Sequence, residues 1–288
     1  MKDAQVGIIG GSGLYEMDGL KVIEERTIDT PFGEPSGPYT IGEVDGVSVA
    51  FLARHGKGHR LTPTELNYRA NIFGMKLLGV HTILSASAVG SMKEEYRPTD
   101  IVFVHQFIDR TRHRADTFFG NGVVAHVAFA DPICADAAFL ASAAGREAGA
   151  TVHEGGVYVC IEGPQFSTRA ESKLYRSWNV DVIGMTNLTE AKLAREAEIC
   201  YVTMALVTDY DCWHETEADV SVDQILDYLR RNAAMAQKLL RLAIPRVAHR
   251  TRECQCASAL RFAIITNHAA IPEKVKRDLN PIIGRYVQ

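Results

Sequence analysis

Short runs of β-branched and apolar residues alternate with helix-start signals along most of this chain, and this alternation constrains its fold more than any other feature. We expect strands at Val6–Ile9, Tyr39–Ala53 (a hairpin folded at Asp45-Gly46), His81–Ala88, Ile101–Val104, Gly156–Ile161, Val180–Ile183 and Ile199–Val207. Strands that are separated by helices form a buried sheet, which the helices cover. The sequence therefore predicts an α/β fold with a central mixed β-sheet flanked by helices.

The helix starts are marked by capping boxes, in which a hydroxyl residue is followed three positions later by Glu or Gln. This pattern occurs at Thr62 to Glu65, Thr168 to Glu171 and Ser221 to Gln224. We expect the first helix to end at Gly79 and the third to stop at Pro245, because proline removes a backbone donor and clashes with the preceding turn. A weaker helix is expected over residues 271–280.

Composition excludes several classes of protein. No repeat or linker divides the 288 residues, so we expect a single domain. The chain has 31 Lys and Arg against 35 Asp and Glu, a formal charge of -4, which argues against a nucleic-acid-binding surface. Since no apolar run has the length of a membrane span or a signal peptide, we expect a cytoplasmic protein without nucleic-acid or membrane partners.

The six cysteines do not follow a metal-binding spacing. None forms a CxxC motif or a Cys/His cluster of zinc-site spacing, so we expect no metal. Cys254 and Cys256 are separated by one residue in a charged, loop-like stretch, where free thiols are the ordinary interpretation and a redox role is the alternative.

Small residues with a hydroxyl or a cation follow four of the expected strands. These exit segments are Gly10–Gly13, Ala53–Gly56, Ser85–Ser91 and Gly184–Thr186. In an open α/β sheet, ligands bind where strands end, and glycine N–H groups, hydroxyls and an arginine together suit a free phosphate. Each segment alone could be a tight turn, and the first matches neither a dinucleotide-binding fingerprint nor a Walker A loop. Four such segments at one edge favour an anion site.

Two acids, Asp209 and Asp211, follow the last long strand at a spacing that directs both side chains the same way. They could be solvated turn residues, but a carboxyl group buried at a strand exit stays protonated and can act as a general acid. A phosphate and a proton donor are the groups needed to break a glycosidic C–N bond by phosphorolysis. A hydrolytic nucleosidase and a non-catalytic phosphate or nucleotide sensor remain alternatives.

Seven motifs in this order give the chain a specific resemblance. They are GIIGGSGLY, DTPFGEPS, ARHGKGH, NYRANI, QFIDRT, EGPQFSTRAES and TDYDCW. Over residues 5 to about 245 the sequence resembles the trimeric purine nucleoside phosphorylases. The resemblance implies one nucleoside phosphorylase domain over residues 1–288 with its catalytic core at about 5–245. Residues 246–288 would then be an extension that packs on the core or on a neighbouring subunit of a homotrimer or a hexamer.

The resemblance also implies a role for each matching residue. Phosphate would be bound by Ser12, Arg54, His55, Ser87, the Ala88 backbone and Thr186. The nucleoside would be contacted by Met185 at the ribose, Phe166 beside the purine, Asp209 and Asp211 at the base, Val222 and Ile225 in an apolar 5′ pocket, and His126 from the neighbouring subunit. Asp209 would protonate the leaving purine, and inorganic phosphate would be a co-substrate with no further cofactor.

The implied substrate is S-methyl-5′-thioadenosine, which would yield adenine and 5-methylthioribose 1-phosphate. A carboxylic acid at position 209 suits a 6-aminopurine, where 6-oxopurine enzymes of the family have asparagine, and the aliphatic Val222 suits a methylthio group. Gly184 and the segment before Glu190 depart from the family pattern, so a broader phosphorylase of adenosine and inosine is the alternative. The CxC pair resembles one in heat-adapted members with internal disulfides, which suggests Cys254–Cys256 and Cys134–Cys200 pairs as a hypothesis.

Overall fold

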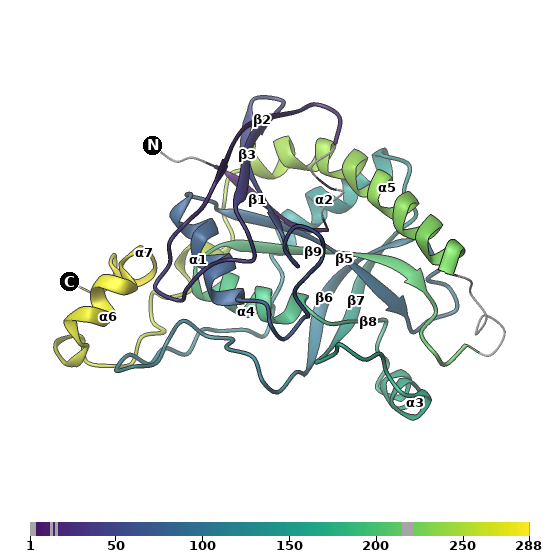
Figure 1. The fold of residues 1–288 in the computed structure, drawn as a ribbon. Helices are drawn as coiled ribbons and strands as arrows, with labels where there is room; N and C mark the ends of the chain where they lie inside the picture. The colour runs from purple at the N-terminus through teal and green to yellow at the C-terminus, as the bar shows by residue number, and fades with distance from the viewer. Residues whose placement is uncertain (1–3, 12–13, 15–16, 215–221, 288) are drawn as a thin grey trace.

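The computed structural model describes residues 4–11, 14, 17–214 and 222–287 (Figure 1). In this part of the chain nine strands form one sheet in the order β2-β3-β4-β1-β5-β8-β7-β6-β9. The strands are β1 (Val6–Gly10), β2 (Leu20–Arg26), β3 (Tyr39–Val44), β4 (Val47–Ala53), β5 (Thr82–Ser91), β6 (Ile101–Arg110), β7 (Val152–Ile161), β8 (Val182–Gly184) and β9 (Cys200–Asp209). The predicted α/β class with a mixed sheet is confirmed.

The sheet closes on itself around β5. This strand pairs in parallel with β1 and β9 and, over its last two residues, in antiparallel with β8. Because β8 pairs with β7, β7 with β6, and β6 with β9, the five strands form a closed ring. Strands β1, β4, β3 and β2 extend outward from it, and β2 is the outermost. The closure places the end of β8 beside the end of β5.

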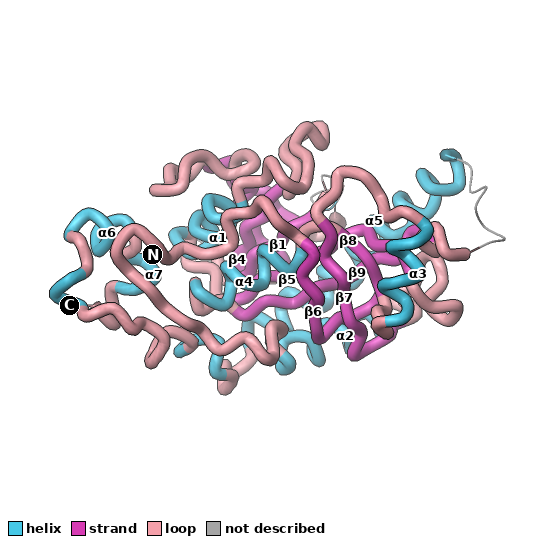
Figure 2. Tube along the Cα trace, turned by 90° about the horizontal axis from the view of Figure 1, so that it is seen from below, coloured by secondary structure: helices cyan, strands magenta, loops and turns pink. Residues whose placement is uncertain are grey.

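Helices cover both faces of the sheet. They are α1 (Tyr68–Leu77), α2 (Ala135–Glu147), α3 (Arg169–Ser177), α4 (Asn187–Glu196), α5 (Val222–His249), α6 (Glu273–Asp278) and α7 (Asn280–Ile283). Helices α2 and α5 pack against each other on one face, and α1 and α4 pack together on the opposite face (Figures 1 and 2). Helix α3 projects from the end of the molecule where β7 and β8 lie.

The first helix begins later than its capping box predicts. Thr62 and Glu65 do make the expected contact, because the Thr62 hydroxyl donates to the Glu65 carboxylate at 2.7 Å, but this pair closes an isolated turn. Helix α1 starts at Tyr68, where the Asn67 side chain accepts a hydrogen bond from the Ala70 backbone. At Thr168 the prediction is confirmed, since Thr168 and Glu171 form a complete capping box at the start of α3.

The predicted stop at Pro245 is wrong, because α5 continues through this proline to His249. Ala243, Ile244 and Val247 are fully buried, so the apolar face of the helix runs past the proline without interruption. Burial on both sides offsets the loss of one backbone hydrogen bond. Ser221, the expected N-cap, lies outside the described residues.

Three elements were not anticipated, namely the edge strand β2, helix α2 and helix α4. Beyond α5, the predicted helix over 271–280 is present as the two short helices α6 and α7. Leu260, Ile271 and Ile282 belong to the same apolar core as α1, so residues of the C-terminal segment pack on the core of their own chain. Among the described residues, no helix combines the length and apolar character that crossing a membrane requires.

Candidate active site

The parallel strands β1, β4, β5 and β9 end at one edge of the sheet. Gly10 lies opposite Ala53, Ile9 opposite Ser85, and Ser85 opposite Thr203. The Arg54 backbone N–H donates to the Gly10 carbonyl at 3.0 Å, which joins the first two exit segments directly. The register therefore brings the segments after β1 and β4 to the middle of β5.

Arg54 is buried at this edge, with 3% of its surface exposed. Its Nε donates to Glu190 at 2.5 Å, its Nη1 to the Ala86 carbonyl at 2.8 Å, and its Nη2 to Ser85 Oγ at 2.6 Å and to Glu190. Burial alone would lower the pKa of Arg54, but the Glu190 carboxylate outweighs this effect and raises it. Since these contacts use four of the five guanidinium N–H groups, at most one Nη1–H can bind an anion.

Asn187, the first residue of α4, is the centre of a buried hydrogen-bond network. Its Oδ1 accepts from three hydroxyls: Ser87 Oγ at 2.6 Å, the Tyr158 hydroxyl at 3.1 Å and Thr186 Oγ1 at 3.4 Å. Its Nδ2 donates to Ser85 Oγ and to the Tyr201 hydroxyl, each at 3.0 Å. The network therefore joins Ser87 and Thr186 to Ser85, which accepts from Arg54.

Thr186 and Ala88 complete the anion-binding features of this edge. Thr186 is the N-cap of α4, so the N-terminus of this helix lies at the site. The Thr186 side chain makes no capping bond to the backbone N–H groups of the helix. Ala88 is exposed although its neighbours Ser87 and Val89 on the central strand β5 are buried. An exposed position in the middle of a sheet marks a place where a ligand can reach the backbone.

His55 has a defined tautomer. Its Nδ1 lies 2.7 Å from the Leu61 carbonyl, which can only accept, so Nδ1 carries the proton and Nε2 has a lone pair. Burial lowers the pKa of His55 to about 4, with a contribution from the positive charge of Arg54. The ring is therefore neutral at pH 7 and stacks on His59 with the ring centres 4.2 Å apart.

Asp209 and Asp211 both lie beside Gly90, which is opposite Asp209 in the pairing of β5 with β9. A methyl group at Gly90 would lie 3.1 Å from Asp209 Oδ1 and 3.3 Å from Asp211 Cβ. Burial raises the pKa of Asp209, a hydrogen bond from Thr208 opposes the rise, and the charge of Asp211 adds to it. Burial also raises the pKa of Asp211. The pair is suited to hold and donate a proton.

The segment between β7 and α3 borders Asp211. The Cys212 thiol donates to the Ser167 carbonyl at 3.3 Å, which fixes this segment beside Asp211. Phe166, next to Ser167, has 85% of its surface exposed. Met185 lies against Gly163 at the start of the same segment, since a methyl group there would be 2.5 Å from the Met185 sulfur.

Of the remaining predicted residues, His126 is the one whose side chain the structure describes, and it lies away from this edge. Ser12 lies outside the described residues, and so do the side chains of Val222 and Ile225. His126 is exposed on another part of the surface, in a hollow of about 350 Å³ that Lys192 and Glu196 of α4 also line. The structure therefore links Arg54, Ser87 and Thr186 through shared hydrogen bonds, and places the two acids, which lie at and just after the end of β9, beside Gly90 near the end of β5.

Sequence reasoning missed the buried residues that hold these groups in position. Glu190, Asn187, Ser85 and Tyr201 carry the network, but none was assigned a role in binding. One signal was present: Asn187 and Glu190 are three residues apart, so in a helix they share a face. Recognising α4 would have directed both side chains toward Arg54 and Ser87.

The sequence matches the family model described as Phosphorylase superfamily over residues 5–245. This chain belongs to the phosphorylase superfamily. The S-methyl-5′-thioadenosine phosphorylase of Geobacter sulfurreducens is 62% identical over 283 residues, which cover 98% of this chain and 99% of that protein. Among solved structures, a methylthioadenosine phosphorylase from an antarctic soil metagenomic library is 49% identical, with a TM-score of 0.95 and coverage of 98% and 99%.

A more distant superfamily structure is a methylthioadenosine phosphorylase from Schistosoma mansoni in complex with adenine. It is 36% identical, with a TM-score of 0.83, and the match covers 90% of this chain and 96% of that one. The fold, the order of elements and nearly the full length are therefore shared with phosphorylases of this superfamily.

Proposed function

We propose that this chain catalyses the phosphorolysis of S-methyl-5′-thioadenosine to adenine and 5-methylthioribose 1-phosphate. The observation that carries the proposal is the position of Asp209, a half-buried acid with a raised pKa at the end of β9, opposite Gly90 near the end of the strand β5 that also holds Ser87 and Ala88. The names of the relatives reported above support the same reaction. Asp209 and Asp211 are the proposed catalytic residues.

Phosphate binds, in this proposal, between the exits of β1, β4, β5 and β8. Ser12, Ser87 and Thr186 supply hydroxyls, the Ala88 backbone and the start of α4 supply N–H groups, and Arg54 supplies its remaining Nη1–H. The neutral His55 contributes an acceptor, since its Nε2 lone pair can receive the O–H of a hydrogen phosphate ion. The site therefore selects an anion that still carries a proton.

The bound phosphate attacks C1′ as the bond to the purine breaks. The sugar develops oxocarbenium character and the purine accumulates negative charge, which a proton at its ring nitrogen relieves. Asp209 donates that proton, while Asp211 receives a hydrogen bond from the 6-amino group. Met185 packs on the ribose, Phe166 stacks beside the purine, and Val222 and Ile225 line the 5′ pocket. Inorganic phosphate is a co-substrate, and the proposed reaction uses no organic cofactor.

We also propose a homotrimer, or a hexamer of two trimers, in which His126 enters the neighbouring subunit's 5′ pocket. The exposed apolar side chains near His126 support this arrangement. Ile265 donates its backbone N–H to Val124 at 3.0 Å, and Phe262 and Ile265 have 87% and 65% of their surfaces exposed. Sedimentation equilibrium should give a mass that is a multiple of three chain masses, and Phe262→Asp should lower this mass.

A cytoplasmic location completes the proposal and is tested by cell fractionation.

The reaction is tested by following adenine release from methylthioadenosine with and without phosphate. We expect release that depends on phosphate, together with one equivalent of 5-methylthioribose 1-phosphate. Release without phosphate would instead show a hydrolytic nucleosidase, and binding without turnover would show a sensor. Parallel assays with adenosine and inosine distinguish a broad phosphorylase, which would turn over all three at similar kcat/KM.

A further inference from the structure

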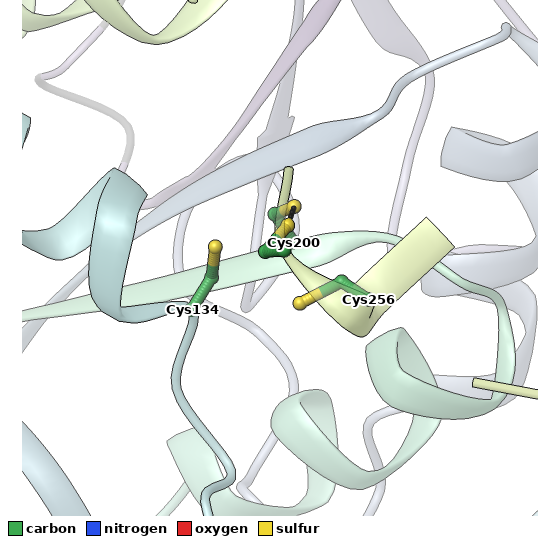
Figure 3. Close-up of side chains that lie close together, drawn as sticks. Cys134, Cys200 and Cys256 are labelled. Atoms are coloured by element: carbon green, nitrogen blue, oxygen red, sulfur yellow. Dashed lines mark hydrogen bonds between the residues drawn. The ribbon is translucent and has the colours of Figure 1, made fainter. Parts of the chain in front are cut away.

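Four of the six cysteines come together at a place that the proposed reaction does not use. Cys134 is the N-cap of α2, Cys200 is the first residue of β9, and Cys254 and Cys256 lie on the segment after α5. All four sulfur atoms lie within 4.8 Å of one another. Figure 3 shows the thiols of Cys134, Cys200 and Cys256 facing one another from these three segments.

The spacing of the sulfur atoms suits a tetrahedral metal ion. Zinc binds thiolates at about 2.3 Å, so the sulfurs of a four-cysteine site are about 3.8 Å apart. Cys200 Sγ and Cys254 Sγ are 3.4 Å apart, and the other pairs lie below 4.8 Å. Within the described parts of the chain, no other group of three or more Cys, His, Asp or Glu side chains has ligand atoms gathered in this way.

The surroundings of the cluster favour a negatively charged centre. Cys134, Cys200 and Cys256 are buried, and each belongs to the main apolar core. Arg250 Nη2 lies 3.8 Å from Cys134 Sγ, and Arg252 Nη2 lies 3.6 Å from Cys200 Sγ. The Nε atoms of both arginines are buried without a hydrogen-bond partner. Both arginines are half-buried, and a negatively charged centre beside them would supply a counter-charge that uncharged thiols do not.

We propose that Cys134, Cys200, Cys254 and Cys256 bind one structural zinc ion. On binding, each thiol loses its proton, and four thiolates around Zn²⁺ leave two negative charges. Arg250 and Arg252 supply two positive charges beside the sulfurs, so the centre and its surroundings are neutral together. Four protein ligands fill the tetrahedron, which makes the site structural rather than catalytic.

The proposed ion connects the C-terminal segment to the core of the subunit. The segment that follows Cys256 pairs with the loop that carries His126: the His126 N–H donates to the Ala263 carbonyl at 2.8 Å, and Ala125 pairs with Ile264. Fixing Cys254 and Cys256 to β9 and α2 therefore also holds the loop around His126. Loss of the ion should loosen both segments, and this consequence does not depend on the proposed substrate.

The four cysteines show no zinc-type spacing along the chain because they come from three separate segments. Two of them, Cys254 and Cys256, are separated by one residue, whereas Cys134 and Cys200 are distant from them and from each other. A search for closely spaced motifs cannot find such a site. The structure gives all six cysteines as free thiols.

The full-length protein, purified without chelators, should contain about one zinc ion per chain by elemental analysis. Replacing the ion with Co²⁺ should give the d–d absorption of tetrahedral cobalt and a thiolate charge-transfer band. Cys134→Ser and Cys256→Ser should each reduce the metal content to near zero. Cys160→Ala changes a buried cysteine outside the cluster and should retain the full content.

Two results would overturn the proposal, and both use the unmodified chain, so they do not require the variants to fold. One is fully reduced protein that binds neither Zn²⁺ nor Co²⁺ after dialysis against each metal. The other is disulfide bonds among the four cysteines, found by mass spectrometry after thiols are alkylated at the moment of lysis. The second result would support the alternative of oxidised cysteine pairs.

Discussion

Arg54 and Glu190 form a buried ion pair between residues 136 positions apart, with the Arg54 Nε 2.5 Å from a Glu190 carboxylate oxygen. The two side chains have 4% and 2% of their surfaces exposed. Glu190 also accepts hydrogen bonds from Ser85 Oγ at 2.7 Å and from the Tyr201 hydroxyl at 2.6 Å. These contacts join helix α4 to the residue that follows β4 and to β5. The Arg54–Glu190 ion pair also sets the direction in which the remaining Nη1–H of Arg54 points.

We expect Glu190→Gln to destabilise the protein strongly. Removing one partner of a buried ion pair leaves an uncompensated charge and lowers the free energy of unfolding by about 3–5 kcal/mol. Urea denaturation measures this change. The KM for phosphate should also rise, because Arg54 loses the partner that orients it.

A matched control for Glu190→Gln is available on the surface. Arg246 and Glu147 form an ion pair whose side chains have 32% and 55% of their surfaces exposed. Glu147→Gln should change the unfolding free energy by less than about 1 kcal/mol and leave the KM for phosphate unchanged. Equal effects of the two variants would contradict the structural role of the Arg54–Glu190 pair.

Much of this fold could be predicted from local patterns. The β-branched runs correctly placed the strands from β1 to β9 apart from β2, whose exposed residues Val22 and Ile23 do not follow a burial pattern. The ends of the helices were predicted less accurately than the strands. The Thr62 capping box closes a turn, and the helix passes Pro245 because tertiary packing outweighs one lost hydrogen bond.

From the sequence, the site could be predicted only as the group of segments that follow the strands. Parallel strands end at one edge, so Arg54 and Ser87 were expected to approach each other. Their actual connection runs through Asn187 and Glu190, which no strand or glycine pattern reveals. The cysteine cluster was hidden for a related reason, since its members meet only through the packing of β9, α2 and the C-terminal segment.

Asp209→Asn should lower kcat for methylthioadenosine by about 10²–10⁴-fold, the usual contribution of a general acid. Burial raises the pKa of Asp209, so the acid stays protonated to higher pH than a solvated aspartate. The wild-type rate should therefore fall as pH rises through this pKa, and the variant should lose this dependence. Steady-state rates across pH measure both effects.

A comparison of substrates separates proton donation from simple binding. Asparagine at position 209 can donate to a 6-oxopurine, so Asp209→Asn should increase the turnover of inosine relative to methylthioadenosine. Asp211→Asn should change KM more than the pH profile. An unaltered substrate profile and pH dependence in Asp209→Asn would show that another group supplies the proton.

Gly90→Ala should lower turnover with a modest effect on folding. A Cβ at this position would lie 3.0 Å from Ile183 Cγ2 and 3.1 Å from Asp209 Oδ1, so the carboxyl group must move. Gly37→Ala is the matched control, because a Cβ there has no neighbour within 4 Å. We expect kcat to fall at least about tenfold in Gly90→Ala, since small misplacements of a catalytic group have large effects. Unchanged kcat in Gly90→Ala would place the reacting proton elsewhere.

Glu196 should make stability depend on pH. It is buried near the C-terminal end of α4 and accepts hydrogen bonds from the Phe118 backbone and the Thr117 hydroxyl, each at 2.7 Å. Burial raises the pKa of Glu196 from 4.5 to about 7. The folded state therefore binds a proton that the unfolded state releases. The stabilisation is complete below pH 4.5, declines between pH 4.5 and 7, and is absent above.

Glu196→Gln replaces the titrating group with an amide whose oxygen can accept from the Phe118 N–H and whose nitrogen can donate to the Thr117 hydroxyl. The unfolding free energy of the wild type relative to this variant should fall by roughly 3 kcal/mol between pH 4.5 and 8, as linkage predicts for such a shift. Glu154→Gln is the control: the hydrogen bond from Ser142 lowers the pKa of Glu154, so this residue adds no such decline above pH 5. Urea denaturation at several pH values measures all three proteins, and parallel curves for the wild type and Glu196→Gln would show that Glu196 is ionised throughout this range.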